Sequence, residues 1–257
     1  MGTHNTSDGR TIKSLERGFE IIETLVGLEG ARLTDVSTAV GLSASTTHTY
    51  LQTLIETGYV RRVGDRYELS LRFLQQGGRV RQSVDVYDVA RPEVDRLARE
   101  TNEVASLGIE EDGQRVLIYK SEGNNAIYDN APTGEYTNMH WSALGKALLS
   151  RYSRAELEAI VDEYGLEAQT DRTITDVETL RAELEQIRGR GYSIENEERR
   201  VGIRSVGVPI VTDDDDVIGA LSISGPKNRI NDAWIEETAV PLLRNAANIV
   251  EVKYVHN

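Results

Sequence analysis

The residues at positions 41–54 place short polar side chains on one side of an expected helix. Leu51, Leu54 and Ile55 recur at helical spacing and form one apolar stripe, which Thr47 joins. The other side and its flank carry groups that donate and accept hydrogen bonds: Ser45, Thr46, His48, Thr49 and Gln52. Such a helix directly after a tight turn fits the DNA major groove. An ordinary amphipathic surface helix is the alternative.

Three arginines follow in two β-rich runs. Residues 59–63 and 66–69 flank a Gly64-Asp65 turn, which predicts a β-hairpin. Guanidinium groups on a hairpin beside a DNA-reading helix suit contacts with phosphates or with the minor groove, and here they are Arg61, Arg62 and Arg66. Solvated arginines on an edge strand are the alternative.

The elements that must position these groups are three helices. The first runs from Ile12 to residues 27–30, with apolar positions at Leu15, Phe19, Ile22, Leu25 and Val26. Thr34 is expected to cap the second, which Gly41 ends, and Ser43 to cap the third. Three helices and a hairpin predict a winged helix-turn-helix over residues 11–69, after a disordered leader at residues 1–10.

The next segment is expected to be a helical linker. It covers residues 70–82, with Leu71 and Leu74 on one face and Gly77-Gly78 as a flexible point. A helix over residues 84–101 follows, in which Pro92 is expected to cause a kink or to begin a new first turn.

The remaining chain, residues 83–257, alternates strand and helix patterns. Strands are expected at 104–109, 116–119, 126–128, 192–194, 206–211 and 217–224. Helices are expected at 142–151, 154–164, 177–190 and 232–252, the second opened by a Ser153/Glu156 capping box and the last interrupted near Pro241. A mixed sheet with helices on one face predicts an α+β sensor-type domain.

Three serines in this second domain suit recognition of a small ligand. Ser222 and Ser224 alternate on one strand, so their hydroxyls share a face, and Ser205 begins the preceding strand. Glu195 and Arg204 are the expected charged groups of the same cavity. Converging hydroxyls in an apolar pocket fit a polar or carboxylate-bearing metabolite. Local hydrogen bonds on a half-exposed sheet are the alternative.

No residue pattern supports catalysis, a metal site or a cofactor. The chain has no cysteine, and its four histidines lack the spacing of a zinc site or a catalytic triad. Neither Gly145-Lys146 nor the segment at 225–227 has the glycine pattern of a phosphate loop. The acidic run at 213–216 is interpreted as a solvated hairpin turn, because a calcium loop needs a longer ligand pattern.

The net charge of −13 is unevenly distributed. Residues 1–80 carry nine basic and nine acidic side chains, whereas residues 81–257 carry 20 and 33, so nucleic acid contacts are expected only in the first third. Arginine outnumbers lysine by 24 to 5, which favours a protein of a salt-accumulating halophile. No apolar run could span a bilayer and the N-terminus has no signal-peptide core, so we expect a cytoplasmic protein.

From Thr11 to Asn248 the chain resembles the IclR family of transcription regulators. The resemblance rests on residues 11–17, 41–60 and 139–149 and on a C-terminal pattern that includes Gly191-Tyr192, Gly207 and Pro209. It implies a winged helix-turn-helix, a linker helix and a GAF-like effector domain. It further implies dimers or tetramers that bind palindromic promoter DNA. The family's ligand contacts carry over to Ala143, Leu144, Glu195, Ser205, Ser222 and Ser224.

The chain also departs from the family pattern. Family members often have a basic residue at the positions of Ala44 and Thr49, and they prefer a smaller residue at Leu144. Since the reading helix has no Lys or Arg, recognition is expected to use its polar groups, including Ser43, and the hairpin arginines. We therefore expect a ligand-responsive regulator of catabolic genes, not an enzyme, that takes a small organic acid or sugar-derived metabolite. A metabolite-binding protein or enzyme that uses the winged helix only for protein contacts is the alternative.

Overall fold

The computed structural model describes residues 11–127 and 131–256. The expected leader at residues 1–10 and Tyr128 of an expected strand lie outside the described residues. The chain divides into two compact units, Met1–Val80 and Arg81–Asn257. The division falls inside α4 (Arg72–Gln82), which is a continuous helix through Gly77 and Gly78.

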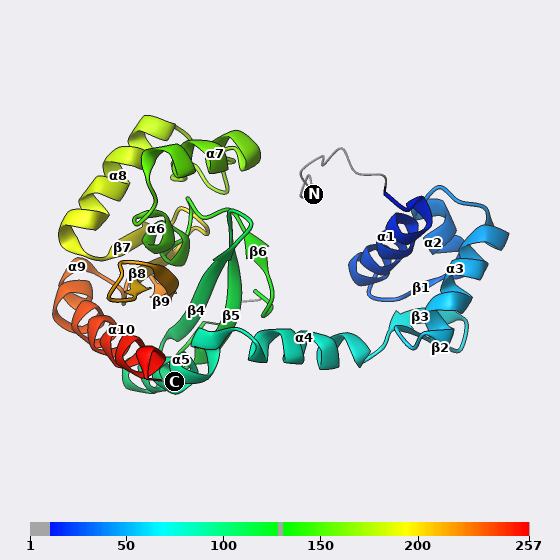
Figure 1. Ribbon diagram of the computed structural model, residues 1–257, viewed down its shortest axis with the longest axis horizontal. Helices are drawn as coiled ribbons and strands as arrows, with labels where there is room; N and C mark the ends of the chain where they lie inside the picture. Colours follow the sequence, from blue (N-terminus) through cyan, green and yellow to red (C-terminus); the bar gives the residue numbers. More distant parts are fainter. Residues whose placement is uncertain (1–10, 128–130, 257) are drawn as a thin grey trace. The chain divides into compact units, whose positions relative to one another are not determined.

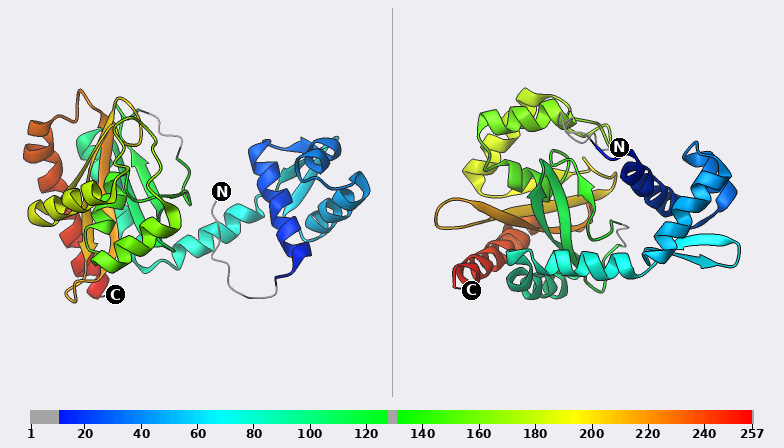
Figure 2. Two further views of the ribbon diagram at one scale, coloured as in Figure 1. Left: turned by 90° about the horizontal axis from the view of Figure 1, so that it is seen from above. Right: turned by 45° about the vertical axis from the view of Figure 1, so that its right-hand side comes forward.

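In the described part of unit 1, three helices precede α4, together with a three-stranded antiparallel sheet in the order β1-β3-β2. Its elements are α1 (Lys13–Gly27), β1 (Ala31–Arg32), α2 (Leu33–Ala39), α3 (Ala44–Glu56), β2 (Val60–Val63) and β3 (Arg66–Leu69). The hairpin of β2 and β3 extends away from the helices (Figure 2). The core is small and includes Ile21, Leu25, Val36, Leu51 and Tyr67. The expected winged helix-turn-helix is confirmed.

Two details of unit 1 differ from the prediction. α2 begins at Leu33 with Arg32 as its N-cap residue, not Thr34, because the Asp35 carboxylate accepts the Arg32 backbone N–H at 3.1 Å. In α1 only part of the apolar stripe contacts the core. Ile21 and Leu25 are buried, whereas Leu15, Phe19 and Val26 are exposed.

Unit 2 is built on a six-stranded sheet in the order β6-β5-β4-β9-β8-β7. The strands are β4 (Val104–Glu111), β5 (Gln114–Glu122), β6 (Tyr136–Thr137), β7 (Ser193–Asn196), β8 (Ile203–Val211) and β9 (Val217–Pro226). α5 (Asp85–Thr101) and α10 (Val240–Val255) cover one face, while α6 (Ala143–Leu149), α7 (Arg154–Tyr164) and α8 (Val177–Arg190) lie on the other (Figure 1).

The strands divide their side chains between two apolar clusters. Leu221 and Ile223 pack with α5 and α10, in the same cluster as Leu97 and Leu243. On the opposite face α6 and α8 pack in a second cluster that includes Leu117, Leu144, Leu148 and Leu184. Because neighbours along a strand point to opposite faces, Ser222 and Ser224 face the α6 side.

The α+β class is confirmed, but three expectations for unit 2 are wrong. All pairings in the sheet are antiparallel rather than mixed, and helices cover both faces rather than one. Ala126 and Ile127 are not in a strand, and the edge strand is β6 instead. Of the two alternatives for Pro92, a new first turn is excluded, because α5 continues through this residue.

The interruption of the closing helix is confirmed. α9 (Asp232–Trp234) passes into a π-helical segment, Ile235–Ala239, before α10 begins. Pro241 lacks a backbone N–H and cannot donate to the carbonyl one turn earlier, so the wider turn lies just before it. No helix among the described residues is long and apolar enough to cross a membrane.

Candidate functional site

The polar face of α3 is held outward by its buried side. Thr47 and Leu51 are fully buried in the core of unit 1. Ser43 caps the helix, since its Oγ accepts the Thr46 backbone N–H at 3.1 Å. The predicted DNA-contacting groups of this segment are all exposed: Ser43, Ser45, Thr46, His48, Thr49 and Gln52.

Several of these exposed groups are also bonded within the helix. The Thr49 hydroxyl donates to the Ser45 carbonyl at 3.1 Å, and the Gln52 amide donates to Glu56 Oε1 at 3.2 Å. A hydroxyl that donates one bond still has acceptor capacity, and the amide has a second N–H. The face can therefore form hydrogen bonds with base edges without breaking the helix.

The three hairpin arginines are exposed but differ in what holds them. Arg61 lies opposite Glu68 in the β2–β3 register and its guanidinium is 2.9 Å from that carboxylate. Arg62 donates through Nε to the Gly64 carbonyl at 3.1 Å, and Arg66 donates to the Gly30 carbonyl. An exposed ion pair contributes about 0–1 kcal/mol, so Glu68 does not prevent Arg61 from reaching a phosphate.

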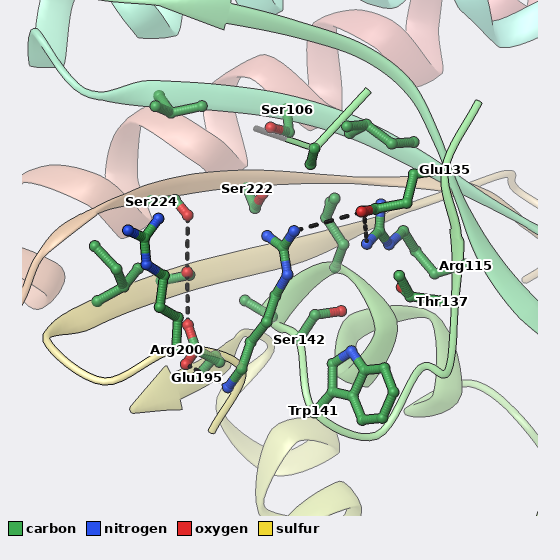
Figure 3. Close-up of a pocket in the computed structure, with 18 of the residues that line it drawn as sticks. Ser106, Arg115, Glu135, Thr137, Trp141, Ser142, Glu195, Arg200, Ser222 and Ser224 are labelled. Carbon is green, nitrogen blue, oxygen red and sulfur yellow. Dashed lines mark hydrogen bonds and ion pairs between the residues drawn. The ribbon is translucent and has the colours of Figure 1, made fainter. Parts of the chain in front are cut away.

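In unit 2, a cavity of about 350 Å³ lies between the sheet and the start of α6 (Figure 3). All six predicted ligand residues line it: Ala143, Leu144, Glu195, Ser205, Ser222 and Ser224. The strand register brings the hydroxyls together, because Ser205 pairs with Ser224 across β8 and β9. On the next strand pair, Ser222 lies opposite Ser106, which also lines the cavity.

The Glu195 carboxyl group accepts hydrogen bonds both from a serine hydroxyl and from the backbone of the turn after β7. Its Oε2 accepts from the Ser205 hydroxyl at 2.8 Å, and the Ser205 and Ser224 hydroxyls are 2.9 Å apart. Its Oε1 accepts the backbone N–H groups of Glu198 and Arg199 at 2.8 and 3.2 Å. Burial raises the pKa of Glu195 to about 7, against the lowering effect of these hydrogen bonds. This carboxyl group is therefore able to change its charge near neutral pH.

The start of α6 fits tightly against the neighbouring chain. Ser142 caps the helix by accepting the Gly145 N–H at 3.0 Å. A Cβ at Gly145 would lie 2.1 Å from the Met139 carbonyl oxygen, so this position requires glycine. The Ser193 hydroxyl donates to the Ala143 carbonyl at 2.6 Å. These contacts hold Ala143 and Leu144 at the cavity wall.

The cavity also contains charged residues that the sequence reasoning missed. Arg115, Glu135, Arg199 and Arg200 line it, and Arg115 is buried. Arg204, expected to supply a charge, instead bonds Asp232 and the Ile230 carbonyl. It precedes Ser205 on β8, so strand alternation turns it to the other face. The same alternation could have predicted that Arg115 faces the cavity, because Arg115 lies two residues before the buried Leu117 on β5 and so shares its face.

The described residues contain no group of three or more His, Asp or Glu side chains that could hold a metal ion. The acidic run at 213–216 lies in the turn between β8 and β9. The site is thus built from hydroxyl, carboxylate and guanidinium groups of the protein.

Comparison with known proteins agrees with both units. The family model "IclR helix-turn-helix domain" matches residues 14–64, and "Bacterial transcriptional regulator IclR C-terminal" matches residues 78–252. Probable HTH-type transcriptional regulator ArcR of Halobacterium salinarum is 33% identical, covering 97% of this chain and 96% of that protein. Acetate operon repressor of Salmonella typhimurium is 30% identical over 93% of this chain and 89% of its own length.

The solved structures lead to the same result. The crystal structure of the Thermotoga maritima IclR superimposes with a TM-score of 0.81 at 28% identity, covering 95% of this chain and 99% of that one. The families and relatives are transcription regulators, so this protein is a DNA-binding regulator with an effector-binding domain and not an enzyme. The chain belongs to the IclR family of transcription regulators.

Proposed function

We propose that the cavity of unit 2 binds a small organic acid, which changes the affinity of unit 1 for promoter DNA. The observation that carries this proposal is the hydrogen-bonded series from the buried Glu195 through Ser205 to the half-buried Ser224, which lines a cavity of about 350 Å³. A volume near the lower end of typical ligand pockets suits a metabolite of a few carbon atoms.

The charges around the cavity favour an anion. Three guanidinium groups (Arg115, Arg199, Arg200) and two carboxyl groups (Glu135, Glu195) line it, a surplus of one positive charge that becomes two when Glu195 is protonated. The chain as a whole carries −13, so this local surplus is opposite in sign to the rest of the surface. A carboxylate of an organic or sugar-derived acid matches it.

For DNA recognition, the proposal assigns direct contacts to α3 and phosphate contacts to the hairpin. Ser45, Thr46, His48, Thr49 and Gln52 read base edges in the major groove, while Ser43 contacts the backbone. Arg61, Arg62 and Arg66 bind phosphates or the minor groove. A homodimer or homotetramer in the cytoplasm supplies two reading helices for a palindromic site.

The effector proposal is tested by fluorescence anisotropy with the DNA upstream of the protein's own gene, titrated with candidate organic acids. In Ser222→Ala the acid concentration that changes DNA binding should rise about tenfold, the effect of one lost hydrogen bond. Ser121→Ala, on the same sheet but outside the cavity lining, is the matched control. An unchanged response in Ser222→Ala would contradict the pocket assignment.

The DNA contacts are tested with the same DNA and no acid. Thr49→Ala should weaken binding about tenfold, whereas Thr38→Ala on α2 should leave it unchanged. The two threonines are matched because each is exposed and donates to the carbonyl four residues earlier. Equal affinities for both variants would contradict the reading face.

A further inference from the structure

Arg115 is a buried cation in the wall of the cavity. It lies on β5 and its side chain is 3% exposed. Room for it comes from Gly108 on the neighbouring strand, because a Cβ there would lie 3.3 Å from both Cγ and Cδ of Arg115. A guanidinium group in such surroundings requires an anion beside it.

Glu135 supplies that anion from a separate segment of chain. The Glu135 carbonyl accepts the Leu117 N–H at 3.0 Å, which holds its backbone against β5. Its Oε2 lies 3.1 Å from Arg115 and 3.5 Å from an Nη of Arg199 (Figure 3). A single carboxylate oxygen is therefore shared by two guanidinium groups inside the cavity lining. Two guanidinium groups thus converge on one carboxylate, which is the charge arrangement that a ligand carboxylate would need.

The two polar ends of the cavity are separate. Glu195 and Ser224 lie at one side in Figure 3, and Arg115 and Glu135 at the other. The two members of the Arg115/Glu135 pair differ in exposure. The Glu135 side chain is 26% exposed, whereas that of Arg115 is 3% exposed. Glu135 is therefore the partner that an incoming carboxylate can replace, because it can be solvated on leaving.

We infer that Arg115 and Arg199 form a second anion-binding subsite, which Glu135 occupies as an internal stand-in for a ligand carboxylate. Resting on the proposed function, this inference identifies the effector as a diacid. One end of the diacid binds the serines, and its second carboxylate displaces Glu135 from the two guanidinium groups. Glu135 then sets the ligand affinity that is needed for its displacement. A monoacid has one carboxylate, so it cannot bind the serines and replace Glu135 at the same time.

Calorimetric titration of the full-length protein tests this subsite. The probes are linear dicarboxylates from malonate to suberate, the monocarboxylates of equal carbon number, and ω-phosphono acids that distinguish a carboxylate from a phosphate at the second end. At one chain length the dicarboxylate should bind about tenfold more tightly than its monocarboxylate partner. Arg199→Gln should abolish this preference. Tighter binding of the phosphono acids than of every dicarboxylate would overturn the assignment of a carboxylate to the second end.

Two glutamate variants distinguish competition from a structural role. Glu135→Gln should bind the dicarboxylate several-fold more tightly than wild type and show a lowered Tm that the dicarboxylate restores. Glu185→Gln, an exposed glutamate paired with Arg188 on α8, is the matched control and should change neither. A lowered Tm that no diacid restores would show that Glu135 only neutralises Arg115, and the inference would be wrong.

The experiments distinguish a wrong subsite from a wrong effector pocket. If monocarboxylates bind and Ser222→Ala weakens them, while no dicarboxylate is preferred in wild type or Glu135→Gln, the subsite is wrong and the effector pocket stands. If no acid binds either protein, the subsite is also wrong, and the anisotropy assay then decides the function independently.

Discussion

The outer face of α3 and the cavity of unit 2 use polar groups in opposite ways. The residues of α3 from Ala44 to Ile55 include no Lys, Arg, Asp or Glu, although this face is exposed to water, where a charge is readily solvated. The cavity lining contains five charged side chains, of which Arg115 and Glu195 are buried, where a charge is unfavourable unless it is paired. The solvent-exposed face of α3 therefore lacks charged side chains, whereas the cavity lining has both cationic and anionic ones.

This difference indicates how each region recognises its ligand. Under the proposed function, the neutral face of α3 would bind DNA by hydrogen bonds, which depend little on counterion release, so its contribution would be insensitive to salt. The buried guanidinium group of Arg115 is weakly screened by salt, so the proposed contact with an anion would persist at high salt. Both properties suit the salt-rich cell that the excess of arginine over lysine predicts.

The largest expected effect concerns the buried charge behind the cavity. Lys146 on α6 is 1% exposed, and its ammonium group lies 2.6 Å from Glu198, in the turn that Glu195 holds. Lys146→Met should lower the free energy of unfolding by about 3–5 kcal/mol, because Glu198 would stay buried without its cation. Urea denaturation measures this loss.

Two further variants check the cause of that loss. Lys146→Met combined with Glu198→Gln should recover part of the stability, since the glutamine carries no charge that needs the lost ammonium group. Lys253→Met, whose side chain is 50% exposed and pairs with Glu93, should change stability by less than about 1 kcal/mol. If Lys146→Met were as mild as Lys253→Met, burial would not govern the charges of unit 2.

The second prediction concerns pH and Glu195. Its pKa of about 7 lies above the value of an exposed glutamate, so the folded protein holds this proton more tightly than the unfolded chain. Wild-type stability should therefore decrease as the pH rises from about 4.5 to about 7, by about 3 kcal/mol at about 1.4 kcal/mol per unit. Glu195→Gln mimics the protonated group and should lack this decrease. Parallel stability curves for the two proteins between pH 5 and 8 would contradict it.

A third prediction changes the neutral face of α3 directly. Thr49→Arg adds a cation where other family members are expected to have one, and it should strengthen binding to DNA of any sequence. The slope of log affinity against log salt should become more negative by about 0.9 for one added phosphate contact. Gln186→Arg, exposed on α8 in unit 2, should leave the slope unchanged. An equal slope in wild type and Thr49→Arg would show that a cation at position 49 gains no phosphate contact, and the placement of this face against DNA would be wrong.

The smallest expected effect is on the buried side of α3. The Thr47 hydroxyl is fully buried and has no hydrogen-bond partner among the described residues. Thr47→Val has the same shape and removes this unsatisfied group, so the free energy of unfolding should rise by about 1 kcal/mol. Thr53→Val, at an exposed position of the same helix, should change it by less than about 0.5 kcal/mol. Destabilisation by Thr47→Val would reveal a partner for the hydroxyl.

Two features that depend on neighbouring residues were predicted correctly, whereas two that depend on distant segments were not. The capping box of α7 and the bounds of α8 are local patterns, and both were predicted correctly. The antiparallel pairing of every strand and the two-sided helical cover depend on contacts between distant segments, and both were predicted wrongly. Ala126 and Ile127 had strand-like composition but have no paired neighbour in the described sheet.

The sequence by itself determined the polar face of α3 and the common face of Ser222 and Ser224, because helical and strand periodicity dictate where neighbouring side chains point. Only the tertiary structure decided which charges enter the cavity. Arg115, Glu135 and Arg199 come from β5, from the segment before β6 and from the turn before β8. No helical or strand periodicity in the sequence relates these three residues. They come together because of the strand order and the course of the connecting loops.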